Sequence, residues 1–186
     1  MNKWKKLESE IILDSKFFKV RRDIVELPNN ERKEWIYWDS PDSAMLIGMT
    51  NEKKLVMIKQ YRYMVNDTVI EFPSGGVNMS ESIESGAKRE FEEETGYVCD
   101  KLIKLGAFYE TYGQLNRKIH FFFANSIHKT RQKLDRGNKG YENIEVTLVD
   151  YHHAVDLALQ NKIVAMGSGL AILMLKEKID RKEITL

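Results

Sequence analysis

The sequence predicts an α/β fold in which strands of a mixed sheet precede and follow one central helix. Two apolar runs of strand length, AMLIGM at 44–49 and KLVMIKQYRY at 54–63, stand before a glutamate-rich helical segment at about 82–95. Further strand-like segments follow that helix, and two helical segments come after Asp150. A chain of 186 residues can bury a substantial core and suits one domain with a small appended subdomain.

The first predicted element is a β-hairpin between Phe17 and about Trp38. Apolar and polar residues roughly alternate in KFFKVRRDIVEL and KEWIYWD, and a Pro-Asn-Asn turn at 28–30 separates the two runs, as expected of paired strands. The apolar runs at 44–49 and 54–63 are predicted strands joined by a polar turn. We expect a short strand at about 68–72 next, and then a turn over Pro73, Ser74, Gly75 and Gly76.

The helix predicted at about 82–95 has suitable residues at both ends. Ser80 or Ser82 can act as its N-cap, with acidic residues in the first turn, and Gly96 suits the position just after the last turn. Its apolar residues recur at i, i+4 and i+8 and predict one buried stripe. These residues are Ile83, Ala87 and Phe91.

The elements predicted after the central helix complete the sheet and add two helices. Strands are expected at about 102–109, 118–124 and 144–149. Asp150 is a good N-cap for a helix that ends at about Gln160, and a last helix is expected at about 168–179.

Composition limits the class of protein. Apolar residues make up 42% and charged residues 31% of the chain, and its formal net charge is +1, so nothing in the overall charge favours nucleic acid or an anionic membrane as a partner. The single cysteine, Cys99, excludes an intrachain disulfide and fits a reducing compartment. The charged start leads into no apolar signal region, and no stretch approaches the roughly 20 apolar residues of a membrane span. We therefore expect a cytoplasmic protein.

Three glutamates of the predicted helix carry the strongest chemical signal. Glu90, Glu93 and Glu94 stand at i, i+3 and i+4 and so share one helix face. Like charges one turn apart repel each other, and clustered carboxylates suit a hard cation such as Mg²⁺ or Mn²⁺. The alternative is a solvated helix face, since glutamate-rich helices are common.

The spacing around these glutamates decides between the two interpretations. From Gly75 onward the segment fits G-x5-E-x7-R-E-U-x-E-E-x-G-U, where U is a bulky apolar residue, and every defined position agrees. The matching residues are Gly75, Glu81, Arg89, Glu90, Phe91, Glu93, Glu94, Gly96 and Tyr97. This pattern resembles the signature, or box, of the Nudix hydrolases.

The resemblance implies a fold, a reaction and a domain division. A Nudix fold is an α/β/α sandwich with a mixed sheet, and it would cover residues 43–186. The reaction is hydrolysis of a nucleoside diphosphate linked to another group. Residues 1–42 look like the extra N-terminal antiparallel β subdomain of the ADP-ribose pyrophosphatase branch. In that branch the subdomain supports a homodimer and helps to build the substrate site.

The resemblance also implies roles for the box residues. It makes Glu90 and Glu94 the main metal ligands, with Glu93 nearby as a ligand or through water. The backbone carbonyl of Ser74 is a further ligand. Arg89 would orient the box through an ion pair with Glu81. The catalytic set implied in this way is Glu93, Glu94, Arg89 and a base from a later loop, and the structural set is Gly75, Glu81 and Gly96.

The general base is expected in the loop that precedes the strand at 144–149. Glu142 is the best positional match for it, and would also help to hold the metal. Glu145 is the second choice. A solvated loop carboxylate is the alternative for Glu142.

Substrate recognition is carried by other segments. Arg62 and Glu71 match positions of the ADP-ribose branch, and Arg suits bidentate phosphate binding. Stacking on a base is expected of three aromatic residues, with core packing as the alternative for each. They are Phe18, Trp35 and Trp38. Glu110 lies in a loop, 109–114, that lacks the proline typical of ADP-ribose pyrophosphatases, and it is expected to read the sugar.

The function expected from the sequence is therefore Mg²⁺- or Mn²⁺-dependent hydrolysis of a nucleotide sugar. ADP-ribose, cleaved to AMP and ribose 5-phosphate, is the first candidate substrate. One alternative is another nucleotide sugar such as GDP-mannose. A second is a non-catalytic nucleotide sensor, which would tend to lose the box carboxylates. A third, an enzyme acting on nucleic acid, would favour a basic surface.

Overall fold

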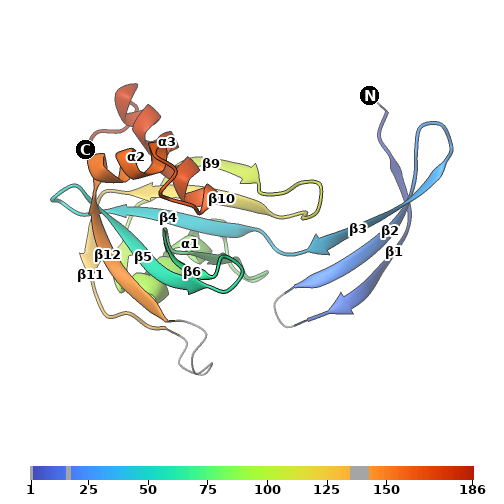
Figure 1. The fold of residues 1–186 in the computed structure, drawn as a ribbon, viewed down its shortest axis with the longest axis horizontal. Helices are drawn as coiled ribbons and strands as arrows, with labels where there is room; N and C mark the ends of the chain where they lie inside the picture. The colour runs from blue at the N-terminus through green and yellow to red at the C-terminus, as the bar shows by residue number, and fades with distance from the viewer. Residues whose placement is uncertain (1, 16–17, 135–142) are drawn as a thin grey trace. The chain divides into compact units, whose positions relative to one another are not determined.

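The computed structural model describes residues 2–15, 18–134 and 143–186 (Figure 1). The chain divides into two compact units. The first unit consists of Met1–Asp42 and Phe108–Lys118, and the second of Ser43–Ala107 and Ile119–Leu186. The sequence led us to expect a division into residues 1–42 and 43–186, which did not assign 108–118 to the first part.

The first unit is built on an antiparallel three-stranded sheet in the order β1-β2-β3. Its strands are β1 (Lys5–Asp14), β2 (Lys19–Glu26) and β3 (Arg32–Asp39). The predicted hairpin is confirmed as β2 and β3, whose turn places Asn30 at a φ of 67°. The sequence did not predict β1, because nearly all its residues are exposed and show no alternation between a core face and a solvent face.

The segment Phe108–Lys118 joins the first unit through hydrogen bonds with the end of β3. The N–H of Trp38 donates to the carbonyl of Gln114 at 2.8 Å, and the Nδ2 of Asn116 donates to Asp39 at 2.6 Å. Leu115 also forms a parallel bridge with Trp38. These contacts connect positions more than 70 residues apart in sequence, so local patterns could not predict them.

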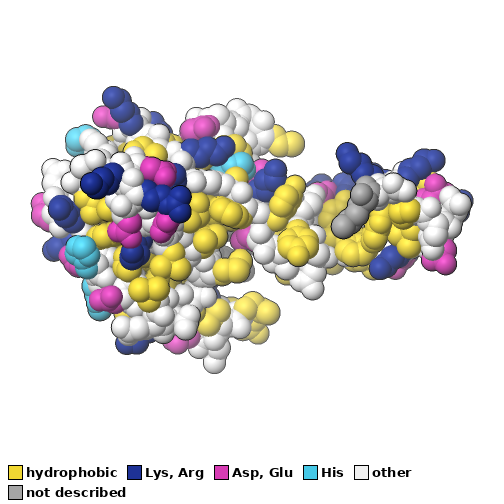
Figure 2. All heavy atoms as spheres, turned by 90° about the horizontal axis from the view of Figure 1, so that it is seen from above, with side chains coloured by type: hydrophobic (Ala, Val, Ile, Leu, Met, Phe, Trp, Pro, Cys, Tyr) yellow, Lys and Arg dark blue, Asp and Glu magenta, His cyan; other side chains and the backbone are white. Residues whose placement is uncertain are grey.

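Exposed apolar side chains gather on the three-stranded sheet, as the space-filling view shows (Figure 2). Those exposed by more than a third are Trp4, Ile11, Ile12, Leu13, Phe18, Ile36 and Trp38. Charged side chains lie among them, with Arg22 paired to both Glu10 and Glu34.

The second unit is built on a mixed sheet in the order β12-β5-β4-β10-β9, in which β6 pairs with β5 and β7 with β4. Strand β10 runs parallel to β4, whereas β12 and β4 run antiparallel to β5. The strands are β4 (Ser43–Met49), β5 (Lys54–Arg62), β6 (Asp67–Glu71), β7 (Ser74–Gly76), β9 (Ile103–Tyr109), β10 (Lys118–Ala124) and β12 (Ile144–Asp150). A separate pair consists of β8 (Tyr97–Cys99) and β11 (Ile127–Lys129).

Helices cover both faces of this sheet, which confirms the predicted sandwich. Alternate residues of β4 serve the two faces: Met45 and Ile47 pack with helices α2 and α3, whereas Ala44 and Leu46 pack with α1. The helices are α1 (Ile83–Thr95), α2 (Tyr151–Leu159) and α3 (Met166–Asp180). No helix formed by the described residues is long and apolar enough to cross a membrane.

Helix α1 has the ends that the sequence predicted. The Oγ of Ser82 accepts the N–H of Ser85 at 3.1 Å, and Gly96 adopts a φ of 70° and donates to the carbonyl of Glu92. The ring of Phe91 lies over Gly48 of β4, where a Cβ would come within 2.3 Å of it. One expectation was wrong: Ser74–Gly76 is a short strand rather than part of a turn, because its backbone pairs with β4.

Candidate active site

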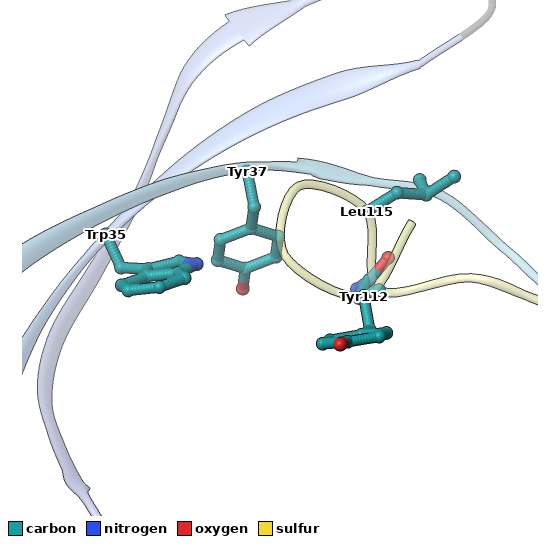
Figure 3. A pocket seen from close by; sticks show the side chains of 5 residues that line it. Trp35, Tyr37, Tyr112 and Leu115 are labelled. Carbon is teal, nitrogen blue, oxygen red and sulfur yellow. The ribbon is translucent and has the colours of Figure 1, made fainter. Parts of the chain in front are cut away.

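In the first unit, aromatic side chains line a pocket of about 210 Å³ (Figure 3). Trp35 and Tyr37 come from one face of β3, since residues two apart in a strand point to the same side. Tyr112, Leu115 and Asn116 come from the segment that joins β3. Tyr37 and Tyr112 were not among the predicted site residues; the spacing from Trp35 could have indicated Tyr37, but no local pattern indicates Tyr112.

The other two aromatic candidates line a second pocket of the first unit. Phe18 and Trp38 lie with their ring centroids 5.5 Å apart, beside Leu115 and Arg117. Both rings are exposed, Trp38 by 55%, so the core-packing alternative does not hold for this pair. Trp35 is partly buried and contacts Trp4 edge-on at 5.6 Å.

Glu110, the expected sugar-reading residue, is paired within its own segment. The Nε and Nη2 atoms of Arg117 lie 2.7 and 2.6 Å from one of its carboxylate oxygens. The pair is partly buried, and its arginine also borders the pocket of Phe18 and Trp38. Glu110 is therefore ion-paired with Arg117, which was not among the predicted site residues.

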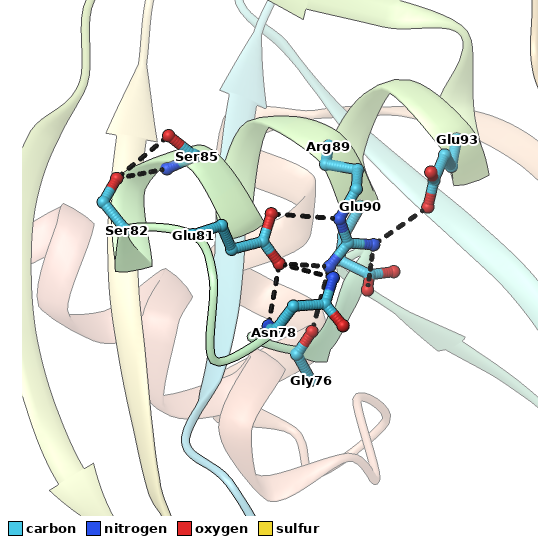
Figure 4. A network of polar contacts seen from close by, with 8 residues as sticks. All are labelled: Gly76, Asn78, Glu81, Ser82, Ser85, Arg89, Glu90 and Glu93. Atoms are coloured by element: carbon cyan, nitrogen blue, oxygen red, sulfur yellow. Dashed lines mark hydrogen bonds and ion pairs between the residues drawn. The ribbon is translucent and has the colours of Figure 1, made fainter.

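In the second unit, Arg89 is the centre of the polar network around the box (Figure 4). Its Nη2 donates to Glu81 at 2.8 Å and to the carbonyl of Gly76 at 3.0 Å. Its Nη1 donates to Glu90 at 2.7 Å and to Glu93 at 3.1 Å. The expected pairing with Glu81 is present, and the same guanidinium also donates to Glu90 and Glu93.

The pair of Arg89 and Glu81 fixes the chain that enters α1. Glu81 accepts hydrogen bonds from both the backbone N–H and the Nδ2 of Asn78, each at 2.8 Å. The hydrogen bonds from Arg89 and Asn78 lower the pKa of Glu81 to about 2. The hydrogen bond to Glu81 likewise raises the pKa of Arg89. Both groups are therefore charged at neutral pH, and the entry to the helix is held by ionic hydrogen bonds.

Glu90 and Glu94 converge on β7. One oxygen of Glu94 accepts the backbone N–H of Ser74 at 3.0 Å. A Cβ at Gly75 would lie 2.2 Å from the carboxylate carbon of Glu90, so a larger residue there would displace that carboxylate. Burial raises the pKa of Glu94 to about 8, and the nearby charge of Glu90 adds to the rise. Glu93 lies nearer to solvent, with 40% of its side chain exposed.

The donor set fits a hard divalent cation, although it is not arranged around one. Among the described residues, no group of three or more carboxylate, imidazole or thiol side chains forms a metal-binding cluster. The physical reason is that Arg89 holds Glu90 and Glu93, while Glu94 bonds to Ser74. The raised pKa of Glu94 nevertheless shows that negative charge there is poorly compensated, which a bound cation would relieve.

Arg62 and Glu71 form an ion pair near this carboxylate. The Nε of Arg62 donates to Glu71 at 2.7 Å, and Glu71 is almost buried. Burial raises the pKa of Glu71, although the charge of Arg62 opposes the rise. Both side chains also act on the pKa of Glu94, so they belong to the same neighbourhood. Arg62, expected to bind phosphate, is thus partly committed to Glu71.

Of the two candidates for the general base, the structure describes only one. Glu142 lies outside the described residues. Glu145 is exposed on β12, where its carboxylate lies 3.6 Å from the Nζ of Lys59. Glu145 is therefore ion-paired with Lys59 rather than with a box residue.

Comparison with known proteins identifies the family. Residues 39–165 match the NUDIX domain, and residues 4–35 match the nucleoside diphosphate sugar hydrolase N-terminal domain. An ADP-ribose pyrophosphatase of Bacillus subtilis is 32% identical over 96% of this chain and 97% of its own length. A methanol dehydrogenase activator of Bacillus methanolicus is 34% identical over 67% of this chain and 68% of its own length. A GDP-mannose pyrophosphatase of Yersinia pestis is 25% identical over 89% of this chain and 86% of its own length.

A solved structure supports the fold. The crystal structure of an ADP compounds hydrolase superposes with a TM-score of 0.82 and covers 98% of this chain and 97% of its own, at 19% sequence identity. The box on α1, the sandwich around it and these similarities agree. The chain belongs to the Nudix family, and it is a hydrolase.

Proposed function

We propose that this protein hydrolyses the pyrophosphate bond of a nucleoside diphosphate linked to a sugar, with ADP-ribose as the first candidate. The observation that carries the proposal is the convergence of Glu90 and Glu94 on β7 beside the ion pair of Arg62 and Glu71. The similarity to an ADP-ribose pyrophosphatase along nearly the whole chain supports the choice of substrate.

The box residues are proposed to hold Mg²⁺ or Mn²⁺. Glu90 and Glu94 would be the main ligands, joined by Glu93, the carbonyl of Ser74 and Glu142. A bound divalent ion would neutralise phosphate charge and make a bound water more acidic. The chain's own part is to hold the carboxylates in place: Arg89 orients Glu90 and Glu93, and the N–H of Ser74 orients Glu94. Glu142 is proposed as the base.

Substrate-binding residues are proposed within each unit. In the second unit, Arg62 would contact a phosphate with the part of its guanidinium not committed to Glu71, since 43% of its side chain is exposed. In the first unit, the aromatic residues would stack on the base. These are Phe18, Trp35 and Trp38, to which the pocket adds Tyr37 and Tyr112. Glu110, paired with Arg117, would read the sugar.

We also propose a homodimer that acts on small molecules in the cytoplasm. The exposed apolar side chains on the three-stranded sheet favour self-association, because a large apolar patch is unfavourable in water. The single cysteine and the balanced charge agree with a cytoplasmic enzyme that binds neither membrane nor nucleic acid. Light scattering after gel filtration measures the mass, and a monomer would contradict the dimer.

A second nucleotide sugar is the main alternative substrate. The similarity to a GDP-mannose pyrophosphatase and the absence of the family's proline from the 109–114 loop both favour it. A non-catalytic nucleotide sensor is disfavoured, because the box keeps all its carboxylates.

The test is a panel of nucleotide sugars incubated with Mg²⁺ in H₂¹⁸O, with the products analysed by mass spectrometry. We expect AMP and ribose 5-phosphate from ADP-ribose, and the label shows which phosphorus water attacks. Faster cleavage of another nucleotide sugar would transfer the proposal to that substrate, and no cleavage of any would refute it.

A further inference from the structure

Residues 130–133, which we call the strap, run across the C-terminal end of α1. They follow β11, whose pairing with β8 brings the chain back to the helix. The N–H of Thr130 donates to the carbonyl of Gly96 at 2.6 Å, and the N–H of Lys133 donates to that of Glu93 at 3.0 Å. Between them, the Nε2 of Gln132 donates to the backbone carbonyl of Glu94 at 2.6 Å. The strap is thus hydrogen-bonded to the last turn of α1, which carries Glu93 and Glu94.

Gly96 allows the strap to come this close. A Cβ at this position would lie 2.5 Å from the backbone nitrogen of Gln132 and 3.0 Å from the carbonyl carbon of Arg131. The left-handed φ of 70° already favours glycine here. Glycine is therefore required twice, for the conformation that ends the helix and for contact with the strap.

The contacts matter because the last carbonyls of a helix have no partner within it. In α1 the carbonyl of Glu92 accepts the N–H of Gly96, while the next two carbonyls are satisfied by the strap. Without these donors the last turn can fray, and it is the turn that positions Glu93 and Glu94. The same Nε2 lies 3.5 Å from the carbonyl of Ile144, the first residue of β12.

Glu94 is consequently held at two points. Its carboxylate accepts the N–H of Ser74 on β7, and its main-chain carbonyl accepts the amide of Gln132. The first contact fixes the end of the side chain, and the second fixes the backbone from which the side chain starts. Such outer contacts commonly set the geometry of a metal ligand.

We propose that Gln132 is a positioning residue for the carboxylates of the box, acting through the main chain of Glu94. It does not itself bind substrate or metal. The inference rests on the proposed role of Glu90, Glu93 and Glu94 in holding a divalent cation. It adds a residue outside the box, 38 positions further along the chain.

The test replaces Gln132 with methionine, which has a similar length and no donor. We expect Mn²⁺ to bind about 10-fold more weakly, measured by electron paramagnetic resonance on the protein without substrate. Raising the Mg²⁺ concentration should then restore much of the lost hydrolysis. Gln132→Asn, whose amide is one methylene shorter, should weaken Mn²⁺ in the same direction. The matched control is Gln160→Met at the exposed C-cap of α2, which should bind Mn²⁺ like the wild type.

A double-mutant cycle separates positioning from general loosening. If Gln132 acts through Glu94, adding Gln132→Met to Glu94→Gln should weaken Mn²⁺ binding less than it does in the wild type. Equal losses in both backgrounds, or wild-type affinity in Gln132→Met, would overturn the inference. So would a loss of affinity that only follows the unfolded fraction, measured by circular dichroism.

The outcomes distinguish this inference from the proposed function. Wild-type protein that binds Mn²⁺ but cleaves no nucleotide sugar would refute the proposed substrate and leave the role of Gln132 testable. Wild-type protein that binds no Mn²⁺ would overturn both the metal assignment and the role of Gln132.

Discussion

The box of the second unit and the aromatic pockets of the first differ in how their functional side chains are held. Around α1, polar groups are tied to one another: Arg89 alone contacts Glu81, Glu90, Glu93 and the carbonyl of Gly76. In the first unit, several aromatic rings are exposed, including those of Phe18, Trp38 and Tyr112. A reaction centre needs fixed charges, whereas a surface that stacks on a ligand or a partner needs open apolar area. Substitutions in the two regions should therefore alter different kinetic constants.

The largest effect is expected for Glu94→Gln. The change removes one charge from the proposed metal ligands while it keeps the shape of the side chain. Losing ~3 kcal/mol of transition-state stabilisation would lower kcat by roughly 10²-fold. Turnover of ADP-ribose at saturating substrate measures it. Glu84→Gln, on the exposed first turn of the same helix, is the matched control. Wild-type turnover by Glu94→Gln would show that the hydrogen-bonded carboxylates around α1 are not the reaction centre.

A smaller loss is expected for Arg89→Lys. Lysine keeps the charge but lacks the planar fork that reaches several acceptors at once. The box glutamates should lose their common partner, and kcat should fall about 10-fold. Steady-state kinetics measure this fall against Arg181→Lys, an exposed arginine that pairs with Glu177. If Arg89→Lys behaved like that control, charge alone would be sufficient and the geometry of the network would not matter.

The opposite kinetic pattern is expected in the first unit. Trp35→Ala removes an aromatic face worth ~1–3 kcal/mol of stacking, so KM should rise roughly 10-fold. The value of kcat should stay near that of the wild type, because the box is untouched. Tyr63→Ala in the second unit, where the ring is 82% exposed, is the control. A fall in kcat with unchanged KM would contradict the proposed role of Trp35 in substrate binding.

The last prediction concerns the pH dependence of stability in metal-free protein. The pKa of Glu94 rises from 4.5 to about 8 in the folded state. Between these values the folded protein binds more protons than the unfolded chain, so its stability falls as pH rises. Glu94→Gln lacks this titration, and its Tm should gain on that of the wild type from about pH 5 to 8.

Thermal melts of both proteins at several pH values, with and without Mg²⁺, measure the difference. Added Mg²⁺ should reduce it, because the ion binds the charged carboxylate. A difference in Tm that is constant across pH would show that folding does not raise the pKa of Glu94.

The sequence was most informative where structure depends on neighbouring residues. The ends of α1 at Ser82 and Gly96, the N-cap Asp150 and the bounds of β10 were predictable, because caps and apolar periodicity are local signals. Helical spacing alone also predicted that Glu90 and Glu94 lie on the same face of the helix.

The sequence was least informative where structure depends on distant contacts. The contact of Phe108–Lys118 with β3 could not be predicted, because its hydrogen bonds join residues more than 70 positions apart in sequence. The close approach of Gln132 to Gly96 could not be predicted either, because the two residues are far apart in sequence. Arg89 was expected to pair with Glu81, but its hold on Glu90 and Glu93 depends on side-chain directions that spacing does not give.

We propose above all that Glu90 and Glu94 of α1 hold the cation required for hydrolysis of a nucleotide sugar. The most direct test is ADP-ribose turnover as a function of Mg²⁺, comparing the wild type with the Glu90→Gln/Glu94→Gln variant. We expect the wild type to release AMP and ribose 5-phosphate, chelation to abolish this release, and the folded variant to show none. Full turnover by that variant would contradict the proposal.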